Sequence, residues 1–145
     1  CMILWSPTLY DNMIYAHEEE QEVMADSMLN LSANFGEPFG AEPDMLLSDG
    51  QELVLAGMEI QVLHTPGHTK GGVCYYLPKE GVLFSGDTLF YCSIGRTDFP
   101  TGSMSELVRS AKEKLLILPE DTKVYPGHGE DTTIHYEKKY NPFLS

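Results

Sequence analysis

The chain has 145 residues and carries 9 Lys and Arg against 22 Asp and Glu, a formal net charge of −13. Hydrophobic residues make up 42% and charged residues 21%, which is the composition of a globular domain rather than of a disordered chain. The acidic balance argues against binding to nucleic acid or to anionic lipid, because both require a basic surface. No apolar run approaches the ~20 residues that span a bilayer, so we expect no membrane partner. Three cysteines without a CxxC spacing predict a reducing, cytoplasmic location.

The first third of the chain predicts few regular elements. We expect irregular structure over residues 1–12 and a short strand over 13–16. A helix is expected over 18–31, because its opening glutamates suit the positive end of the helix dipole and its apolar residues recur at helical spacing. A loop rich in Gly and Pro follows over 34–44.

The remaining two thirds predict a sheet with interspersed helices. From residue 51 the hydrophobic period changes to two, which predicts a hairpin turning at Ala56-Gly57. A helix is expected from Ser103, where Ser103 and Glu106 form a capping box, to residue 118 before Pro119. Other elements are expected as strands over 73–77, 82–85 and 123–125 and a helix over 133–139. This order indicates a layered α/β (α+β) fold in a single domain over residues 1–145.

Three motifs each place a metal-type ligand just after a predicted strand. His68 follows a Pro-Gly turn, Asp87 follows a glycine at the end of an apolar strand, and His128 follows a second Pro-Gly turn. Histidine and carboxylate are ligands that zinc, iron and manganese share. Each motif alone also fits an ordinary structural turn, so the prediction of a metal site depends on the three together.

Together these motifs resemble the metallo-β-lactamase superfamily, and within it the hydroxyacylglutathione hydrolase (glyoxalase II)-like branch. The resemblance extends from about Met13 to the end of the chain. It implies a partial αββα metallo-β-lactamase sandwich, mainly the C-terminal part of that fold. The segments that carry it are HTPGHTKGG at 64–72, LFSGDTLF at 83–90, SIGRTDFPTGS at 93–103 and VYPGHG at 124–129.

The resemblance also implies a role for each ligand. His68 matches a ligand of the first of two metal ions (zinc, or iron or manganese), Asp87 the carboxylate that bridges both, and His128 a ligand of the second. In the family the ions activate a water that attacks a thioester carbonyl, so Asp87 is a catalytic residue and the substrate is a small-molecule thioester such as an S-acylglutathione. Arg96 falls where relatives place a basic residue that meets the substrate carboxylate. Its alternative is a surface salt bridge.

One departure from the family pattern concerns the missing HxHxDH motif, which supplies four of the usual seven ligands and which this sequence does not contain. We therefore expect a truncated domain with an atypical segment over residues 1–12 and weak or absent activity of this chain alone. The alternative is a non-catalytic remnant or interaction module of the same fold. Loss of the opening strands predicts an exposed sheet edge or apolar face, and hence either a homo-oligomer or cover by Ile3, Leu4 and Trp5.

The other histidines and cysteines receive structural interpretations. We expect His17 to be exposed, His64 to support the loop to His68, and His135 to face the final loop. Cys74 lies inside a predicted strand and should be buried. Cys92 lies in a loop with no adjacent base that would activate it as a nucleophile.

Overall fold

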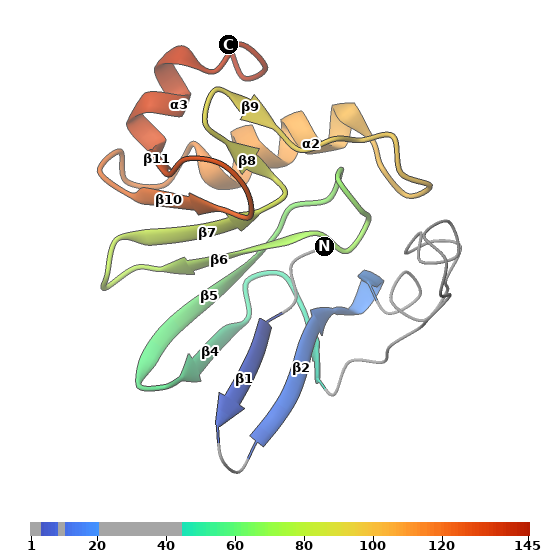
Figure 1. The fold of residues 1–145 in the computed structure, drawn as a ribbon, viewed down its shortest axis with the longest axis vertical. Coiled ribbons are helices and arrows are strands. Elements are labelled where there is room, and N and C mark those ends of the chain that lie inside the picture. Colours follow the sequence, from blue (N-terminus) through green and yellow to red (C-terminus); the bar gives the residue numbers. More distant parts are fainter. Residues whose placement is uncertain (1–3, 9–10, 21–44) are drawn as a thin grey trace.

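The computed structural model describes residues 4–8, 11–20 and 45–145, and a six-stranded sheet forms its centre (Figure 1). The strand order is β11-β10-β7-β6-β5-β4. Strand β10 pairs with β7 in parallel, and the other neighbouring strands pair antiparallel. The strands are β4 (Glu52–Leu55), β5 (Met58–His64), β6 (Val73–Leu77), β7 (Val82–Gly86), β10 (Lys123–Pro126) and β11 (Thr132–Thr133).

The N-terminal segments form a separate three-stranded sheet, in the order β1 (Leu4–Thr8), β2 (Asp11–His17) and β3 (Met45–Leu47). The expectation of irregular structure over residues 1–12 is wrong for these strands. Pro7 argued against a strand there, but β1 is the edge of its sheet, where a residue without an N–H is tolerated. The expected strand over 13–16 is confirmed as the centre of β2. Of the helix expected over 18–31, Glu18–Glu20 form a short 3₁₀ turn (η1), and the rest lies outside the described residues.

Helix α2 (Met104–Ser110) follows the last strand of a small ribbon after β7, and helix α3 (Ile134–Tyr140) follows β11. Helix α2 begins as expected at Ser103, whose hydroxyl accepts a hydrogen bond from the Glu106 N–H at 3.4 Å. It continues as one π-helical stretch, η3 (Ala111–Leu115), in which the Leu116 N–H bonds to the Ala111 carbonyl at 3.0 Å. Helix α3 is capped by Thr133. A two-stranded ribbon, β8 (Leu89–Phe90) and β9 (Ser93–Ile94), precedes α2 and was not expected from the sequence.

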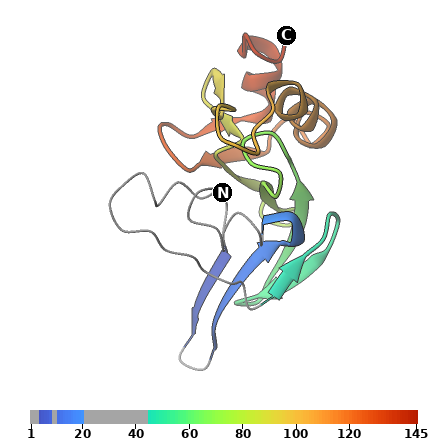
Figure 2. The ribbon, with the colours of Figure 1, turned by 90° about the vertical axis from the view of Figure 1, so that its right-hand side faces the viewer.

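Both faces of the central sheet are apolar. Strand β6 is buried at every position, and its residues alternate between two hydrophobic clusters. Cys74 and Tyr76 pack with Leu107 and Leu115 of the helices, whereas Tyr75 packs on the opposite face in a cluster that includes Leu47 of β3. Figure 2 shows the corresponding layers, with α2 on one side of the sheet and the β1–β2 hairpin on the other. The α/β layering expected from the sequence is therefore confirmed.

Part of the second face remains open to solvent. Phe84 of β7 and Tyr125 of β10 are register partners, and Phe84 is also the register partner of Tyr75, so all three lie on that face. The Phe84 and Tyr125 rings stack at 5.8 Å and are 38% and 37% exposed. This matches the expected exposed apolar sheet face.

The helices that the structure describes are all too short or too polar to span a bilayer.

Candidate metal centre

The three predicted ligands meet at one edge of the central sheet. Strands β7 and β10 run parallel, so the turns after them, which carry Asp87 and His128, lie side by side. The loop from β5 to β6 carries His68 and reaches the same edge, because β6 runs antiparallel to β7. The sequence predicted each of these turns, and the sheet order brings them together.

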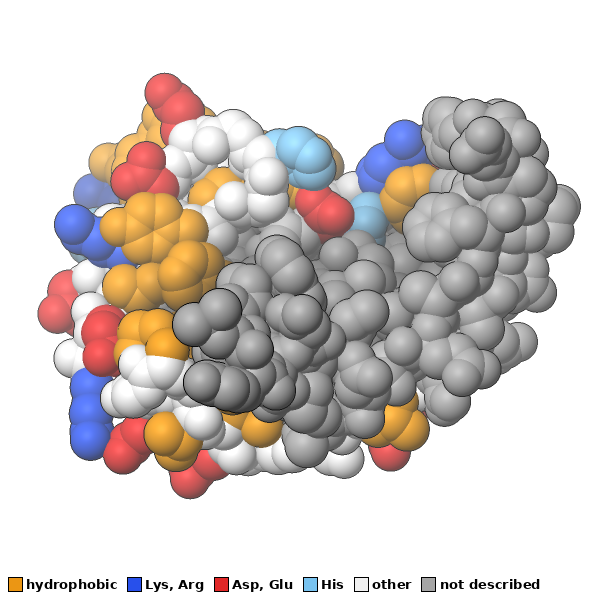
Figure 3. Space-filling view, turned by 60° about the horizontal axis from the view of Figure 1, so that its bottom comes forward, with side chains coloured by type: hydrophobic (Ala, Val, Ile, Leu, Met, Phe, Trp, Pro, Cys, Tyr) orange, Lys and Arg blue, Asp and Glu red, His pale blue; other side chains and the backbone are white. Residues whose placement is uncertain are grey.

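The Asp87 carboxylate lies between the two imidazoles. Its Oδ2 is 3.5 Å from His68 Nε2, and its Oδ1 is 3.1 Å from His128 Nδ1. The His68 and Asp87 side chains are 10% and 26% exposed, whereas that of His128 is 81% exposed. On the face shown in Figure 3, pale-blue histidine and red acidic side chains gather beside a hollow. Each carboxylate oxygen thus faces one histidine, a donor set that fits a carboxylate shared by two ions of the zinc, iron or manganese class.

The orientation of His68 is set by a backbone contact. Its Nδ1 lies 2.8 Å from the carbonyl oxygen of Arg96. Since a carbonyl oxygen can only accept, Nδ1 carries the proton, and the lone pair of the neutral ring is on Nε2, which faces Asp87. Histidine ligands of metals are commonly fixed in this way through their other nitrogen. No local sequence pattern indicates this contact, because it joins residues 28 positions apart.

Close backbone packing holds the turn at Asp87. A Cβ atom added to Gly95 would lie 1.7 Å from the Asp87 carbonyl oxygen, and one added to Gly127 would lie 3.2 Å from Asp87 Oδ1. The Gly95 N–H also donates to the Thr88 carbonyl at 3.1 Å. The segment that carries Arg96 therefore approaches Asp87 more closely than a side chain at Gly95 would allow, and the segment that carries His128 leaves little room for one at Gly127.

Helix α2 fixes the loop that carries His68. The Gly67 carbonyl accepts from the Ser103 N–H at 2.7 Å, and the Ser110 hydroxyl donates to the Pro66 carbonyl at 2.8 Å. Gly67 has a φ of +136°, and a Cβ there would lie 2.3 Å from the Leu107 backbone nitrogen. Glycine is thus required at position 67 for two reasons, the positive φ of the turn and its close contact with α2.

The Arg96 side chain forms the salt bridge that was the alternative to a substrate contact. Its Nε and a terminal nitrogen donate to the two oxygens of Asp98 at 2.7 and 2.6 Å. The guanidinium also lies 4.6 Å from the centre of the Phe99 ring, whose edge contacts His68 at 4.9 Å between ring centres. The hydrogen bond from Arg96 lowers the pKa of the Asp98 carboxyl to about 2 and raises that of Arg96.

The remaining histidines and cysteines divide into confirmed and wrong expectations. The expectation that His17 is exposed is wrong. Its side chain is buried, at 3% exposed, and its ring is stacked on that of His64. His64 ends β5, and its Nε2 contacts the Lys70 carbonyl at 2.8 Å, so it supports the loop to His68 as expected. Burial raises the pKa of the Cys74 thiol to about 11, which confirms a core cysteine. His135 pairs with Glu120 at 3.1 Å. Cys92 Sγ lies 3.8 Å from the Tyr136 hydroxyl.

The sheet with its helices and the His-Asp-His edge define a metallo-hydrolase type of fold. The family model of the metallo-beta-lactamase superfamily matches residues 5–128, so the chain belongs to that superfamily. The fold expected from the sequence, the C-terminal part of a metallo-β-lactamase sandwich, is confirmed by this match and by the solved structures that resemble it.

Three known proteins illustrate the similarity. The chain is 38% identical over 138 residues to the hydroxyacylglutathione hydrolase GloC of Haemophilus influenzae, with 91% of the chain covered. It superimposes on the BLEG-1 B3 metallo-beta-lactamase with a TM-score of 0.83 and 45% identity, and on the di-iron-bound form of TTHA1623 with a TM-score of 0.78 and 37% identity, covering 90% of the chain in each case. The chain spans 64% of the length of each of these proteins.

Proposed function

We propose that this chain supplies the His68, Asp87 and His128 ligands of a two-metal site that hydrolyses small-molecule thioesters, of the S-acylglutathione type or related to it. The observation that carries the proposal is the Asp87 carboxylate, whose two oxygens face two different imidazoles at 3.5 and 3.1 Å. The relative named a hydroxyacylglutathione hydrolase supports the substrate class, and the di-iron-bound neighbour supports two ions. Zinc and manganese suit the same donors.

The residues of this chain would contribute binding, orientation and charge. When bound, divalent ions polarise a carbonyl and lower the pKa of a water molecule so that it can act as a nucleophile. Asp87 supplies the negative charge that both ions would share. The Arg96 carbonyl holds the His68 ring in the tautomer that leaves Nε2 available to a metal. Phe99 beside His68 and Phe90, with its ring 6.3 Å from the His128 ring, would offer apolar contacts to the acyl and thiol parts of a substrate.

Arg96 would bind the carboxylate of such a substrate. In the free protein its guanidinium is engaged by Asp98 through two hydrogen bonds. A substrate carboxylate must therefore replace Asp98 or bind an N–H that Asp98 leaves exposed, and this competition with Asp98 lowers the affinity of Arg96 for the substrate. We place the reaction in the cytoplasm, on the cysteine pattern described above.

A second candidate is a non-catalytic module of the same fold that associates with copies of itself. The exposed Phe84 and Tyr125 on the second sheet face favour this candidate, because apolar aromatic surface of this kind is commonly covered by a partner. Sedimentation of the chain, with Phe84→Ser beside the parent, measures whether this face mediates association.

Metal analysis combined with turnover tests the main proposal. The chain is loaded with zinc, iron or manganese, and bound metal is measured beside hydrolysis of S-lactoylglutathione and of a chromogenic cephalosporin. We expect bound metal and weak thioester hydrolysis. Asp87→Asn should abolish the turnover and lower the amount of bound metal below that of the parent, whereas Asp121→Asn, which makes the same change at an exposed position, should keep both. Turnover that survives Asp87→Asn, or a metal content equal to that of the parent, would contradict the site. Cephalosporin hydrolysis without thioester hydrolysis would replace the substrate class, and absence of both would favour the non-catalytic module.

A further inference from the structure

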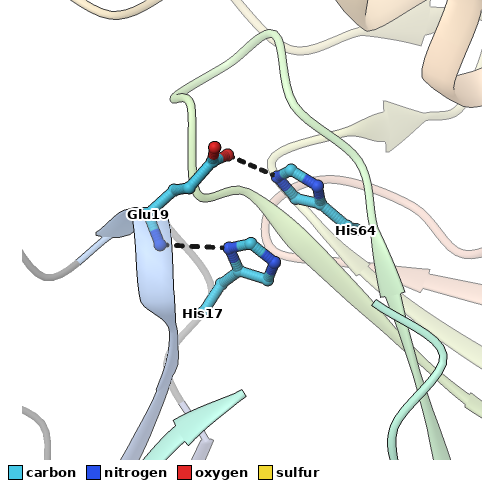
Figure 4. A group of neighbouring side chains, drawn as sticks. All are labelled: His17, Glu19 and His64. Atoms are coloured by element: carbon cyan, nitrogen blue, oxygen red, sulfur yellow. Dashed lines mark hydrogen bonds and ion pairs between the residues drawn. The ribbon is translucent and has the colours of Figure 1, made fainter. Parts of the chain in front are cut away.

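A second group of metal-type ligands lies where the two sheets meet. His17 ends β2, Glu19 lies in η1, and His64 ends β5 (Figure 4). One donor atom from each of the three side chains can be chosen so that all lie within 4.8 Å of one another. None of these residues belongs to the His68, Asp87 and His128 set. The two segments that supply them are 45 positions apart, so the fold and not a local motif brings them together.

His17 is the buried member of this group, at 3% exposed. Burial is the main cause that lowers the pKa of His17, and the neighbouring His64 lowers it further. The Nδ1 of His17 accepts a hydrogen bond from the Glu19 N–H at 3.2 Å, so a metal ion must displace this N–H to bind Nδ1.

The local charge favours a cation. Of the described residues, the acidic neighbours whose charge acts on His17 are Glu18, Glu19 and Asp49, and Asp49 is also paired with Lys114. The negative charges of Glu18 and Asp49 are near enough to His17 to favour its protonated, positively charged form. The Glu19 side chain is 51% exposed and lies 3.3 Å from His64 Nε2. The negative charge of this region attracts cations, and the exposed carboxylate gives them access to the histidines.

Ion binding requires a limited rearrangement. The two rings stack at 3.9 Å with an angle of 9° between their planes. Imidazole donates its lone pair within the ring plane, so one ring must turn for both to face one ion. His64 is the more exposed of the two rings, with its side chain 20% exposed. Its Nε2 lies between two acceptors, Glu19 and the Lys70 carbonyl, so the lone pair of the neutral ring is on Nδ1 and the ring must leave these contacts to present it. Zinc–nitrogen distances of about 2.0–2.1 Å then require the donors to approach by roughly 1–1.5 Å.

We propose that His17, Glu19 and His64 form a second site for one divalent transition-metal ion of the zinc class, independent of the site at Asp87. Two histidines and one glutamate are a ligand set that zinc accepts, with water at the open position. A bound ion would join β2 to the end of β5, and so connect the N-terminal sheet to the strand that leads to His68. It would therefore stabilise the junction between the two sheets.

Cobalt titration tests the proposal in a chain whose first site is removed. In an Asp87→Asn, His128→Ala background, the probe is Co²⁺ alone, followed by visible absorption and calorimetry, with the melting temperature as a second readout. We expect one ion per chain with the absorption of nitrogen-ligated cobalt, and a melting temperature that rises with Co²⁺. Glu19→Gln should raise the Kd at least about 10-fold. Glu18→Gln, which removes the same charge from the exposed neighbouring residue, should change it less than about 2-fold.

His64→Gln provides an independent variant on the other segment, and circular dichroism verifies the fold of each variant. We expect the same loss of binding as in Glu19→Gln, because both remove a ligand. The proposal is overturned if the background variant binds no Co²⁺, if Glu18→Gln and Glu19→Gln weaken binding equally, or if His64→Gln leaves the Kd unchanged. His17, His64 and Glu19 would then only hold the two sheets together and would not bind a metal ion.

Discussion

The His68 imidazole donates its Nδ1 proton to the main-chain carbonyl of Arg96 across 2.8 Å. The preceding residue, Gly95, packs against the Asp87 carbonyl with no room for a side chain. One short stretch of backbone therefore positions two of the proposed ligands. The main chain of this stretch makes the contacts to the proposed metal site. Its side chains form the exposed Arg96–Asp98 pair beside that site.

Replacing Gly95 by alanine should damage the site and the fold together. The new Cβ would lie 1.7 Å from the Asp87 carbonyl oxygen, so the backbone must shift. We expect a loss of about 2 kcal/mol or more in the free energy of unfolding, typical of overpacking, and a loss of metal binding at Asp87. Denaturant unfolding and metal analysis measure the two effects.

Gly57→Ala is the matched control for that variant. Gly57 has a φ of +76° but nothing within 4 Å of an added Cβ, so alanine meets backbone strain without a clash. Its cost should be about 1–2 kcal/mol, with metal binding unchanged. Equal metal loss in both variants would mean that Gly95 has no special contact with the site.

The Asp98 carboxyl should titrate unusually low. The hydrogen bond and charge of Arg96 lower its pKa to about 2, against an ordinary value of 3.8. Because the folded-state pKa is below the unfolded one, the stability contributed by this pair is present above pH 3.8 and is lost as the pH falls through 2. Carboxyl NMR titration should give this low pKa in the parent chain and a value near 3.8 in Arg96→Gln. An unshifted Asp98 in the parent would show that the salt bridge does not persist in solution.

Arg96→Gln also separates the two roles of this residue. The main-chain carbonyl that holds His68 is unchanged by the substitution, so metal affinity should stay within about 2-fold of the parent value. If Arg96 binds the substrate carboxylate, the KM for an S-acylglutathione should rise about 10-fold, the value of one charge-assisted hydrogen bond. A large fall in metal affinity with KM unchanged would contradict this division.

The sequence predicted most of the central sheet and the three ligand-bearing turns, because strand alternation and Pro-Gly turns are local signals. It did not predict the contacts that join distant segments. The His68–Arg96 hydrogen bond and the His17–His64 stack depend on strand order, which no local pattern reports. His17 was expected to be exposed because glutamates follow it, but the junction of β2 with β5 buries its ring. Pro7 suggested irregular backbone in a segment that is an edge strand.

Glu137 is a buried carboxylate that the sequence did not single out. It is fully buried in α3 and accepts hydrogen bonds from the Cys92 N–H at 3.0 Å, the Thr132 hydroxyl at 2.7 Å and the Asn141 amide at 2.8 Å. Glu137→Gln places an NH₂ group against these donors, so we expect a loss of about 2 kcal/mol in the free energy of unfolding. The exposed Glu113→Gln is the control and should change it by less than about 0.5 kcal/mol. Equal effects of the two variants would contradict a structural role for Glu137.

The hairpin between β4 and β5 holds Ala56 in a strained backbone conformation that a substitution can relieve. Its turn residues, Ala56 and Gly57, have φ values of 51° and 76°, and alanine is unfavourable in this left-handed region. Asparagine tolerates the conformation, and Asn-Gly is the preferred pair for such two-residue turns. Ala56→Asn should therefore raise the free energy of unfolding by about 0.5–1 kcal/mol, measured by denaturant unfolding. Ala56→Ser keeps the unfavourable backbone with a small polar side chain and should give little gain. An equal gain in the serine variant would show that the polar side chain, and not relief of the backbone strain, causes the stabilisation.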